Sequence, residues 1–373
     1  MSGDFITKKT AFFLLFVIIL GLSSISFIFF PSIFDISTNN PAEDQSFDPN
    51  PYENRSFIDV LADNIFSGGV PKDGIPAINN PQYINRIEAD LLLEDSDIIF
   101  GLVFEGEIIA FPQRIVVYHE IINTRGNETK ISITYCPLTG SALGFVAHVN
   151  SRETTFGTSG KLVNSNLVMY DRLTGSYWPQ IIGQAVMGEG TNTTLEKVQL
   201  LWTNWGLWKA KYPDTLVLSD ETGYIRPYGN DPYGSYENPN SFYNSGGPIF
   251  STLYFDPQLP EKSVVIGVQL NQSYLAVEKE LIRQEKIINT DLGNQSIVIF
   301  YDKSLDVARV YYSKVNGQDY TFSINNGSIV DDQTNNKWTT LGTSDIGILD
   351  PIFYFDVMWF AWVSFFPDTL LIM

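Results

Sequence analysis

Residues 118–144 read YHEIINTRGNETKISITYCPLTGSALG, and the rest of the fold is expected to form around them. Two runs rich in β-branched residues, at Ile121 and Ile131, flank an Asn-Glu-Thr turn, which is typical of a β-hairpin. The hairpin carries His119, one of two histidines, and Cys136, the only cysteine of the 373 residues. The chemistry of this protein is therefore expected here first.

The composition is that of a folded protein with a strong negative charge. Hydrophobic residues make up 44% of the chain and aromatic residues 14%, which suffices for one large domain or two smaller ones. The formal net charge of -19 repels polyanions, so a nucleic-acid partner is excluded. A single cysteine also excludes an intramolecular disulfide, a dithiol redox couple and a zinc site built from several cysteines.

The N-terminal residues predict a membrane anchor. Residues 1–10 contain Lys8 and Lys9, and residues 11–30 (AFFLLFVIILGLSSISFIFF) carry no charge. A helix of this length spans about 30 Å, the thickness of the hydrocarbon core. The bulky FIFF at its far end favours an uncleaved transmembrane helix over a signal peptide. The lysine pair predicts a cytoplasmic segment 1–10 and an extracytoplasmic remainder, so this is a single-pass protein of the cell membrane.

The next segment, residues 31–56, is rich in Asn, Asp, Pro and Ser and predicts a flexible juxtamembrane linker. Six N-x-S/T sequons fit an outward-facing surface that is open to glycosylation, although a sequence rich in asparagine and serine also produces sequons by chance. The sequons begin at Asn54, Asn127, Asn192, Asn271, Asn294 and Asn326.

The folded part of the sequence repeats itself. At a shift of 166 positions, Ile121-Ile122-Asn123 matches Ile287-Ile288-Asn289, and the strand pattern KISITYC matches SIVIFYD. Further along, DRLTGSYW matches DDQTNNKW, and WGLWKAKYPDT matches WFAWVSFFPDT. Because the matches keep the same order in both copies, they predict an internal duplication.

The duplication divides the folded part into three segments. Residues 57–218 are repeat 1, which carries the His119–Cys136 site, and residues 263–373 are repeat 2, which lacks it. Between them, residues 219–262 form a loop rich in Tyr, Gly and Pro. A loop this long with six tyrosines predicts either a cover that walls a pocket or a plain connection.

Short strands dominate the pattern, so we expect a mainly β fold of two related lobes, arranged as a barrel or as facing sheets. Helices are expected at Pro81–Leu93 and at two Trp-x-x-Trp turns, whose tryptophans share one helical face. The aromatic segment Phe353–Met373 is expected in the core rather than in a membrane. Strands are expected at Ile98–Phe104, Glu107–Phe111, Ile131–Tyr135, Leu143–His148, Val264–Leu270, Ser296–Tyr301 and Ala308–Tyr312.

Longer motifs resemble an uncharacterised prokaryotic family, domain of unknown function 3179. YHEIIN, TYCPLTGSALGF and SGKLVNSNLVMYDRLTGSYWPQIIG are similar to its motifs YHEIVND, TYCPLCGTA and SGLLYNSDLLMYDRxTGSLWSQ, and PKDGIPAINNPQYI resembles its opening motif. The resemblance covers nearly the whole ectodomain but implies no activity. The family motif's second cysteine is Thr139 here, so a C-x-x-C redox role is not available.

The two repeats differ at the residues that carry chemistry. The shift of 166 places His119, Glu120 and Cys136 opposite the ordinary residues Glu285, Lys286 and Asp302. Such asymmetry is expected from a single functional site on a duplicated scaffold, and equally from drift of the second copy.

Three hypotheses follow for this site. In the first, His119 and Cys136 bind copper or zinc, and further ligands come from Glu120, His148, Met169 or Met187. In the second, Cys136 is a nucleophile for acyl transfer or hydrolysis, activated by His119 and oriented by Glu120 or Asp171. In the third, the protein is a cell-surface binding or structural module, and Cys136 is a buried, inert residue.

The second hypothesis also assigns substrate-binding residues. The candidates are Ser159, Asn164, Asp171 and Gln180. Because Asp171 recurs as Asp331 together with a threonine and a tryptophan, it is better explained as part of a turn with a structural hydrogen bond. Ser159 and Asn164 have no such counterpart and are therefore the stronger candidates.

Overall fold

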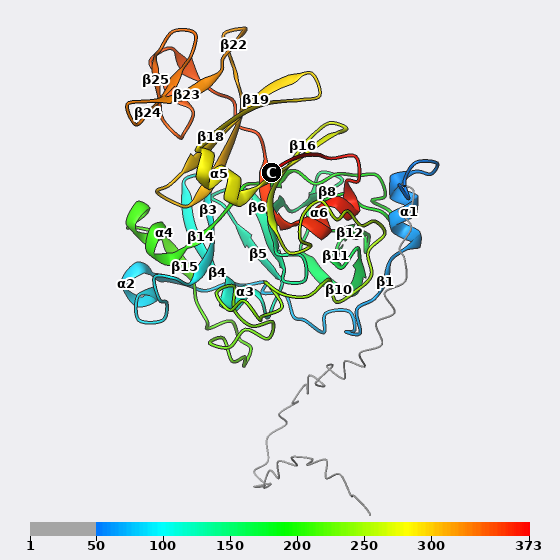
Figure 1. Ribbon diagram of the computed structural model, residues 1–373. Helices are drawn as coiled ribbons and strands as arrows, with labels where there is room; N and C mark the ends of the chain where they lie inside the picture. The colour runs from blue at the N-terminus through cyan, green and yellow to red at the C-terminus, as the bar shows by residue number, and fades with distance from the viewer. Residues whose placement is uncertain (1–49) are drawn as a thin grey trace, which may run out of the picture. The chain divides into compact units, whose positions relative to one another are not determined.

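The computed structural model describes residues 50–373 (Figure 1). The predicted cytoplasmic segment, the membrane span and most of the linker lie outside the described residues. Within residues 50–373, no helix combines the length and the apolar character needed to cross a membrane. Short strands dominate the secondary structure, which confirms the mainly β prediction. Every sheet in this part is open, so the closed-barrel alternative is wrong here.

We call residues 57–218 the first half of the fold and residues 263–373 the second half. The first half contains a five-stranded sheet, which we call its base sheet. Its strands, in spatial order, are β14 (Leu200–Asn204), β3 (Ile98–Phe104), β4 (Glu107–Pro112), β15 (Leu216–Leu218) and β2 (Tyr83–Asn85). All neighbours are antiparallel except β4 and β15, which are parallel. Glu105 and Gly106 connect β3 to β4 with φ values of +51° and +85°, as a tight two-residue hairpin turn requires.

Two further sheets and a short hairpin complete the first half, and their strands pair antiparallel throughout. One sheet contains the hairpin predicted from residues 118–144. In spatial order, this sheet is β13 (Lys197–Val198), β7 (Ser141–Val146), β6 (Lys130–Cys136) and β5 (Ile121–Arg125). The other sheet is β1 (Phe66–Ser67), β10 (Phe156–Val163), β11 (Asn166–Asp171) and β12 (Tyr177–Pro179), and the hairpin is β8 (His148–Val149) with β9 (Arg152–Glu153).

The second half follows the same order of elements. Its base sheet is β28 (Tyr354–Met358), β16 (Val264–Leu270), β17 (Ser273–Glu278) and β29 (Leu370–Ile372), and again the last pair is parallel. A three-stranded sheet follows, of β18 (Ile287–Leu292), β19 (Gln295–Asp302) and β20 (Val307–Tyr312). The remaining strands are β21 (Lys314–Val315) with β22 (Gln318–Asp319), β23 (Phe322–Asn325) with β24 (Ser328–Asp331) and β25 (Lys337–Trp338), and β26 (Thr343–Ser344) with β27 (Gly347–Ile348).

Individual contacts also recur between the halves. In each half, the side chain of one asparagine bonds to both the N–H and the C=O group of a phenylalanine 33 positions later. In each half, the indole N–H groups of two tryptophans also bond to side-chain oxygens seven positions away. The matching pairs are Asn123–Phe156 and Asn289–Phe322, Trp178–Asp171 and Trp338–Asp331, and Trp208–Thr215 and Trp362–Thr369. The shared residues therefore build the scaffold in both halves.

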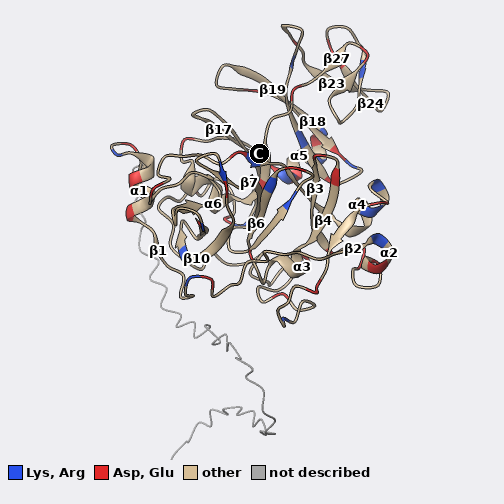
Figure 2. Cartoon of the chain, turned by 180° about the vertical axis from the view of Figure 1, so that it is seen from behind, with Lys and Arg blue, Asp and Glu red and all other residues tan. Residues whose placement is uncertain are grey.

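Within residues 50–373, six short helices connect the sheets. They are α1 (Phe57–Asp63), α2 (Arg86–Ala89), α3 (Gln113–Val116), α4 (Trp205–Lys211), α5 (Lys279–Glu285) and α6 (Trp359–Phe365). The two Trp-x-x-Trp turns are α4 and α6, and all four tryptophans are fully buried, as expected. Figure 2 shows charged residues on α1, α2 and α5, whereas the strands of the first half are drawn mostly in tan.

The helix expected at Pro81–Leu93 is largely wrong. Tyr83–Asn85 instead forms β2, which pairs with β15, and only Arg86–Ala89 is helical. The reason is local, because the Asn85 side chain caps the N–H groups of residues 87 and 88 while Glu88 bonds back to the Asn85 N–H. Such a capping box fixes the helix start.

The cores of the two halves interlock. Helix α6 of the second half packs into the hydrophobic core of β10, β11 and β12 in the first half, and the two regions lie side by side in Figure 1. In return, Trp205 and Trp208 of α4 share a cluster with Leu305 and Val307 of the second half. Phe353–Met373 is accordingly core for most of its length, as predicted.

Candidate functional site

His119 lies just before β5 and is fully buried. Its Nδ1 donates to the Pro76 carbonyl oxygen at 2.7 Å, which leaves Nε2 to accept from the Tyr228 hydroxyl at 2.7 Å. Burial lowers the pKa of the imidazole from 6.5 to about 4. The ring is therefore neutral at pH 7, and both nitrogens already have partners. His119 thus fastens the loop 219–262 to the first half.

Glu120 is buried in a left-handed backbone conformation, with a φ of +57°. Lys286, at the matching position of the second half, has a φ of +66°, and in both cases the backbone oxygen accepts from the facing strand. The conformation is therefore a property of the scaffold. No described residue donates a hydrogen bond to the Glu120 carboxyl group. Burial raises its pKa to about 8.

Cys136 ends β6 and is 1% exposed. Its sulfur accepts from the Leu167 N–H at 3.4 Å and faces the Ser165 carbonyl oxygen at 3.9 Å. Burial, with a smaller contribution from the charge of Glu120, raises the pKa of the thiol to about 11. A protonated, enclosed thiol is a poor nucleophile and a poor metal ligand.

His119 and Cys136 each have their own hydrogen-bond partners in the structure. His119 bonds to Pro76 and Tyr228. Cys136 contacts Ser165 and Leu167. His148 is exposed in the β8–β9 hairpin, and Met169 is buried in β11. Across residues 50–373, no group of three or more His, Cys, Asp and Glu side chains is placed to hold a metal ion. Neither the metal hypothesis nor the nucleophile hypothesis gains support from this geometry.

Ser159 and Asn164 form structural hydrogen bonds. The Ser159 hydroxyl donates to the Val168 carbonyl oxygen across a β-bulge in β10. Asn164 and Ser165 form the two-residue turn between β10 and β11, with φ values of +51° and +58°. The Asn164 amide bonds to Tyr52, Leu253 and Ser364, so it joins three distant segments.

The remaining two candidates, Asp171 and Gln180, are buried and fully bonded. Gln180 joins β6, β7 and β11 through Thr134, Ser141 and Asn166. The Asp171 carboxylate accepts from three backbone N–H groups, the Thr174 hydroxyl and the Trp178 indole. Asp331 binds Thr334 and Trp338 in the same manner, so the predicted structural turn is confirmed.

Asp171→Asn is expected to destabilise the fold by about 2–3 kcal/mol, because an amide N–H₂ would then face donors that the carboxylate satisfied. Asp331→Asn should cost less, since Asp331 accepts fewer of these bonds. Urea unfolding of both variants checks the order. A stable Asp171→Asn protein with altered ligand binding would contradict the structural role.

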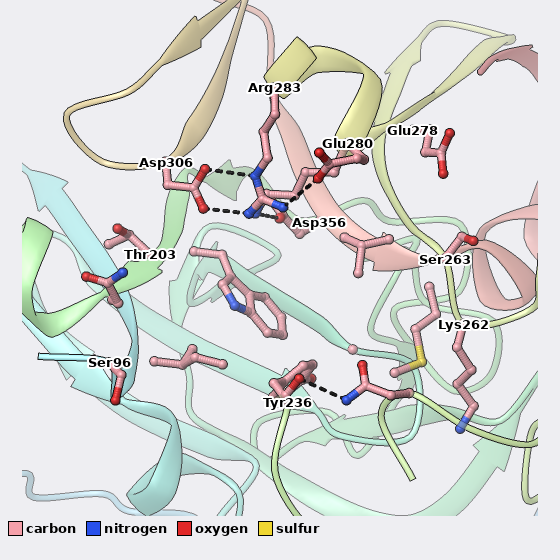
Figure 3. A pocket seen from close by; sticks show the side chains of 18 residues that line it. Ser96, Thr203, Tyr236, Lys262, Ser263, Glu278, Glu280, Arg283, Asp306 and Asp356 are labelled. Atoms are coloured by element: carbon pink, nitrogen blue, oxygen red, sulfur yellow. Dashed lines mark hydrogen bonds and ion pairs between the residues drawn. The ribbon is translucent and has the colours of Figure 1, made fainter. Parts of the chain in front are cut away.

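A pocket of about 480 Å³ lies at the seam between the two halves (Figure 3). We call it the seam pocket. Its lining comes from β3 and β14 of the first half, from the loop through Tyr236 and Asn244, and from β16, α5 and β28 of the second half. Three pairs of lining residues are 166 positions apart, so matching parts of the halves face each other. These pairs are Ser96 with Lys262, Ile98 with Val264, and Gly140 with Asp306.

All charged groups of the seam pocket come from the second half except Lys262, which belongs to the loop. Arg283 forms a two-bond ion pair with Asp306, at 2.9 and 2.5 Å, and also contacts Glu280 at 3.2 Å (Figure 3). The Lys279 ammonium contacts Asp356 at 2.5 Å. The first half contributes only neutral side chains, among them Trp202.

The loop supplies an aromatic wall. Tyr236 stacks on Tyr243 with ring centroids 3.8 Å apart and meets Trp202 edge to face at 5.4 Å. Hydrogen bonds connect the hydroxyl groups of Tyr236 and Tyr243 to Tyr135 of β6. The loop therefore contributes to a pocket, which is the first of the two roles that its sequence suggested.

A family model described as a protein of unknown function (DUF3179) matches residues 72–369. The chain belongs to this family. No curated protein and no solved structure matches the chain. The DUF3179 region spans both halves, the loop and every residue that lines the seam pocket.

Thr139 stands where the family motif has its second cysteine, and it is fully buried in the turn after Cys136. Its hydroxyl bonds to Ser141 and to Asn166. In this DUF3179 protein the turn is therefore held by hydroxyl and amide groups. Thr139 also accepts, through its backbone oxygen, the N–H of Met358 at 3.0 Å, and so fixes the turn to the second half.

Sequence reasoning missed most of the seam pocket. Trp202, Arg283 and Asp356 lie on separate segments, and no local spacing relates them. Two features of the sequence pointed to parts of this pocket: the tyrosine-rich loop and the charged residues of α5. Neither feature indicates which residues of the first half would lie opposite.

Proposed function

We propose that this DUF3179 protein is a membrane-anchored binding protein that holds one small polar molecule in the seam pocket outside the cell. The observation that carries the proposal is the pocket itself. Its volume of about 480 Å³ falls in the usual range for ligand sites, and it lies where two structural units meet. This proposal keeps the third sequence hypothesis, a binding module with an inert cysteine, and gives it a location.

The position outside the cell rests on the sequence and on the exposure of the sequons. The charge-free run of residues 11–30 follows Lys8 and Lys9, as in an anchor whose N-terminus stays in the cytoplasm. The asparagines of all six sequons are exposed. Exposure is what glycosylation at these positions would need.

We also infer that the two halves arose by duplication of one unit. The recurring asparagine, aspartate and tryptophan contacts support this inference, together with the repeated element order. Duplication explains why a pocket forms at the seam, because two copies of one surface face each other there. It also explains why only one half is charged, since the second copy is free to change.

The binding proposal is tested with the full chain in detergent. Isothermal titration with choline, glucose, acetate and inorganic phosphate should detect one bound molecule per chain for at least one probe. Ser96 lines the pocket and its side chain makes no hydrogen bond with the described residues, so Ser96→Trp should fill the space and abolish binding.

Gln272→Trp is the matched control, because Gln272 is exposed in the turn between β16 and β17, outside the pocket. It should bind like the unchanged protein. Binding that survives in Ser96→Trp, or the absence of binding for every probe, would overturn the proposal.

A further inference from the structure

We infer that the ligand of the seam pocket is a small organic cation, such as a primary or quaternary amine. The inference rests on the proposed function and specifies its ligand. Three properties of the pocket carry it: the balance of its charges, the arrangement of its aromatic rings and the field of the whole protein.

Acidic groups outnumber basic groups in the lining. Four carboxylates line the pocket, and three basic side chains accompany them. Two of the basic groups, Lys279 and Arg283, are engaged in the ion pairs with Asp356, Asp306 and Glu280. Figure 2 shows basic and acidic positions close together around α5. Neither basic group is therefore free to bind an anion.

The third basic group is also engaged. The Lys262 ammonium lies 3.2 Å from the centroid of the Phe242 ring and donates to the Phe242 carbonyl oxygen. Burial lowers its pKa to about 8, so its charge is lost as the pH rises through 8. Glu278, by contrast, forms no ion pair with any residue of the described part. The pocket thus retains an uncompensated negative charge.

The aromatic rings suit a cation. Trp202 and Tyr236 meet at 81°, so that they form two walls of a corner. The face of an aromatic ring is electron-rich and attracts an ammonium group, most strongly for tryptophan. Tyr236 is held by its stack on Tyr243, and Trp202 packs edge to face against Phe100 at 4.9 Å. Because both rings are fixed before binding, little ordering is lost when the ligand enters.

The electrostatic field of the whole protein also favours a cationic ligand. The formal net charge of -19 raises the local concentration of cations and repels anions. A ligand with both an ammonium group and hydroxyl groups could also bond to the amide oxygen of Asn244 and the amide nitrogen of Asn204, two lining residues whose other amide atoms are already bonded within the protein. The chemistry that fits is therefore a compact amine with polar substituents.

The test titrates the full chain in detergent with choline, tetramethylammonium, glucose and inorganic phosphate. Choline and tetramethylammonium should bind with one molecule per chain, and their affinity should fall as sodium chloride is raised. Glu278→Gln should weaken binding about fivefold, as expected for one partly exposed charge. Trp202→Leu should weaken it about tenfold or more, through the lost cation–π contact.

Asp345→Asn serves as the control, because Asp345 is an exposed carboxylate outside the pocket. It should leave the affinity unchanged, and circular dichroism confirms that each variant is folded. If glucose or phosphate binds and the cations do not, the inference fails while the proposed function stands. If no probe binds, both fail. Cation binding that is insensitive to Glu278→Gln and Trp202→Leu also overturns the inference.

Discussion

Gly101→Ala is expected to destabilise the protein by about 3 kcal/mol or more, because a methyl group on Gly101 would lie 2.1 Å from the Trp208 ring. The ring cannot move away easily. Trp208 is fully buried, and its indole N–H donates to the Thr215 hydroxyl at 3.0 Å. Chemical denaturation by urea measures the loss directly as a lower midpoint.

The second half offers an internal repeat of this experiment. A methyl group on Gly267 would lie 2.3 Å from the Trp362 ring, so Gly267→Ala should lose a similar free energy of unfolding. Gly229→Ala is the control, because the nearest atom to its added methyl group, on Arg114, is 3.7 Å away. Neutral behaviour of Gly101→Ala would show that α4 shifts freely against β3, contrary to the packing described here.

Much of the β structure follows from local sequence pattern. Ile98–Phe104 and Val264–Leu270 were expected as strands and are found with those bounds. Their apolar residues and bordering turns identify them without any knowledge of the fold. The Trp-x-x-Trp turns are equally local, since their spacing places both rings on one helical face. The exception, residues 81–93, depended on a capping asparagine inside the apolar pattern.

The candidate site could not be predicted in the same way. The pairing of His119 with Cys136 rested on their nearness in the sequence, on two β-rich segments joined by a turn. The groups that surround each side chain come from distant segments instead, such as Tyr228 beside His119. The positive φ of Glu120 is also not indicated by the sequence, because a residue other than glycine rarely adopts it. The seam pocket depends on where β14 and β28 approach each other, which is a property of the tertiary structure.

Glu120→Gln is expected to remove a large pH dependence of stability. In the folded protein burial raises the pKa of Glu120 to about 8, whereas an exposed glutamate has a pKa of about 4.3. The folded state therefore holds a proton that the unfolded state releases, and stability falls as pH rises between these two values. The full difference corresponds to about 5 kcal/mol at pH 8 and above.

The range from pH 6.5 to pH 8 isolates this effect. His119 acts in the opposite sense, because its pKa is lowered to about 4, but only about 0.4 kcal/mol of its contribution develops above pH 6.5. Of the groups that face Glu120, Cys136 has its pKa raised to about 11 and Tyr233 has its pKa raised further, so neither titrates in this range. The buried lysines, Lys197 and Lys262, have pKa values lowered to about 8 and affect stability mainly above that pH.

Within this range the unchanged protein should lose about 2 kcal/mol of stability, since one pH unit corresponds to about 1.4 kcal/mol for a single proton. Glu120→Gln should be nearly flat there and more stable than the unchanged protein at pH 8. Glu285→Gln, at an exposed carboxylate of the second half, should keep the original slope. Urea midpoints at pH 6.5, 7.2 and 8 decide the matter. An unchanged slope in Glu120→Gln would mean that the carboxyl group finds solvent or a partner when it ionises.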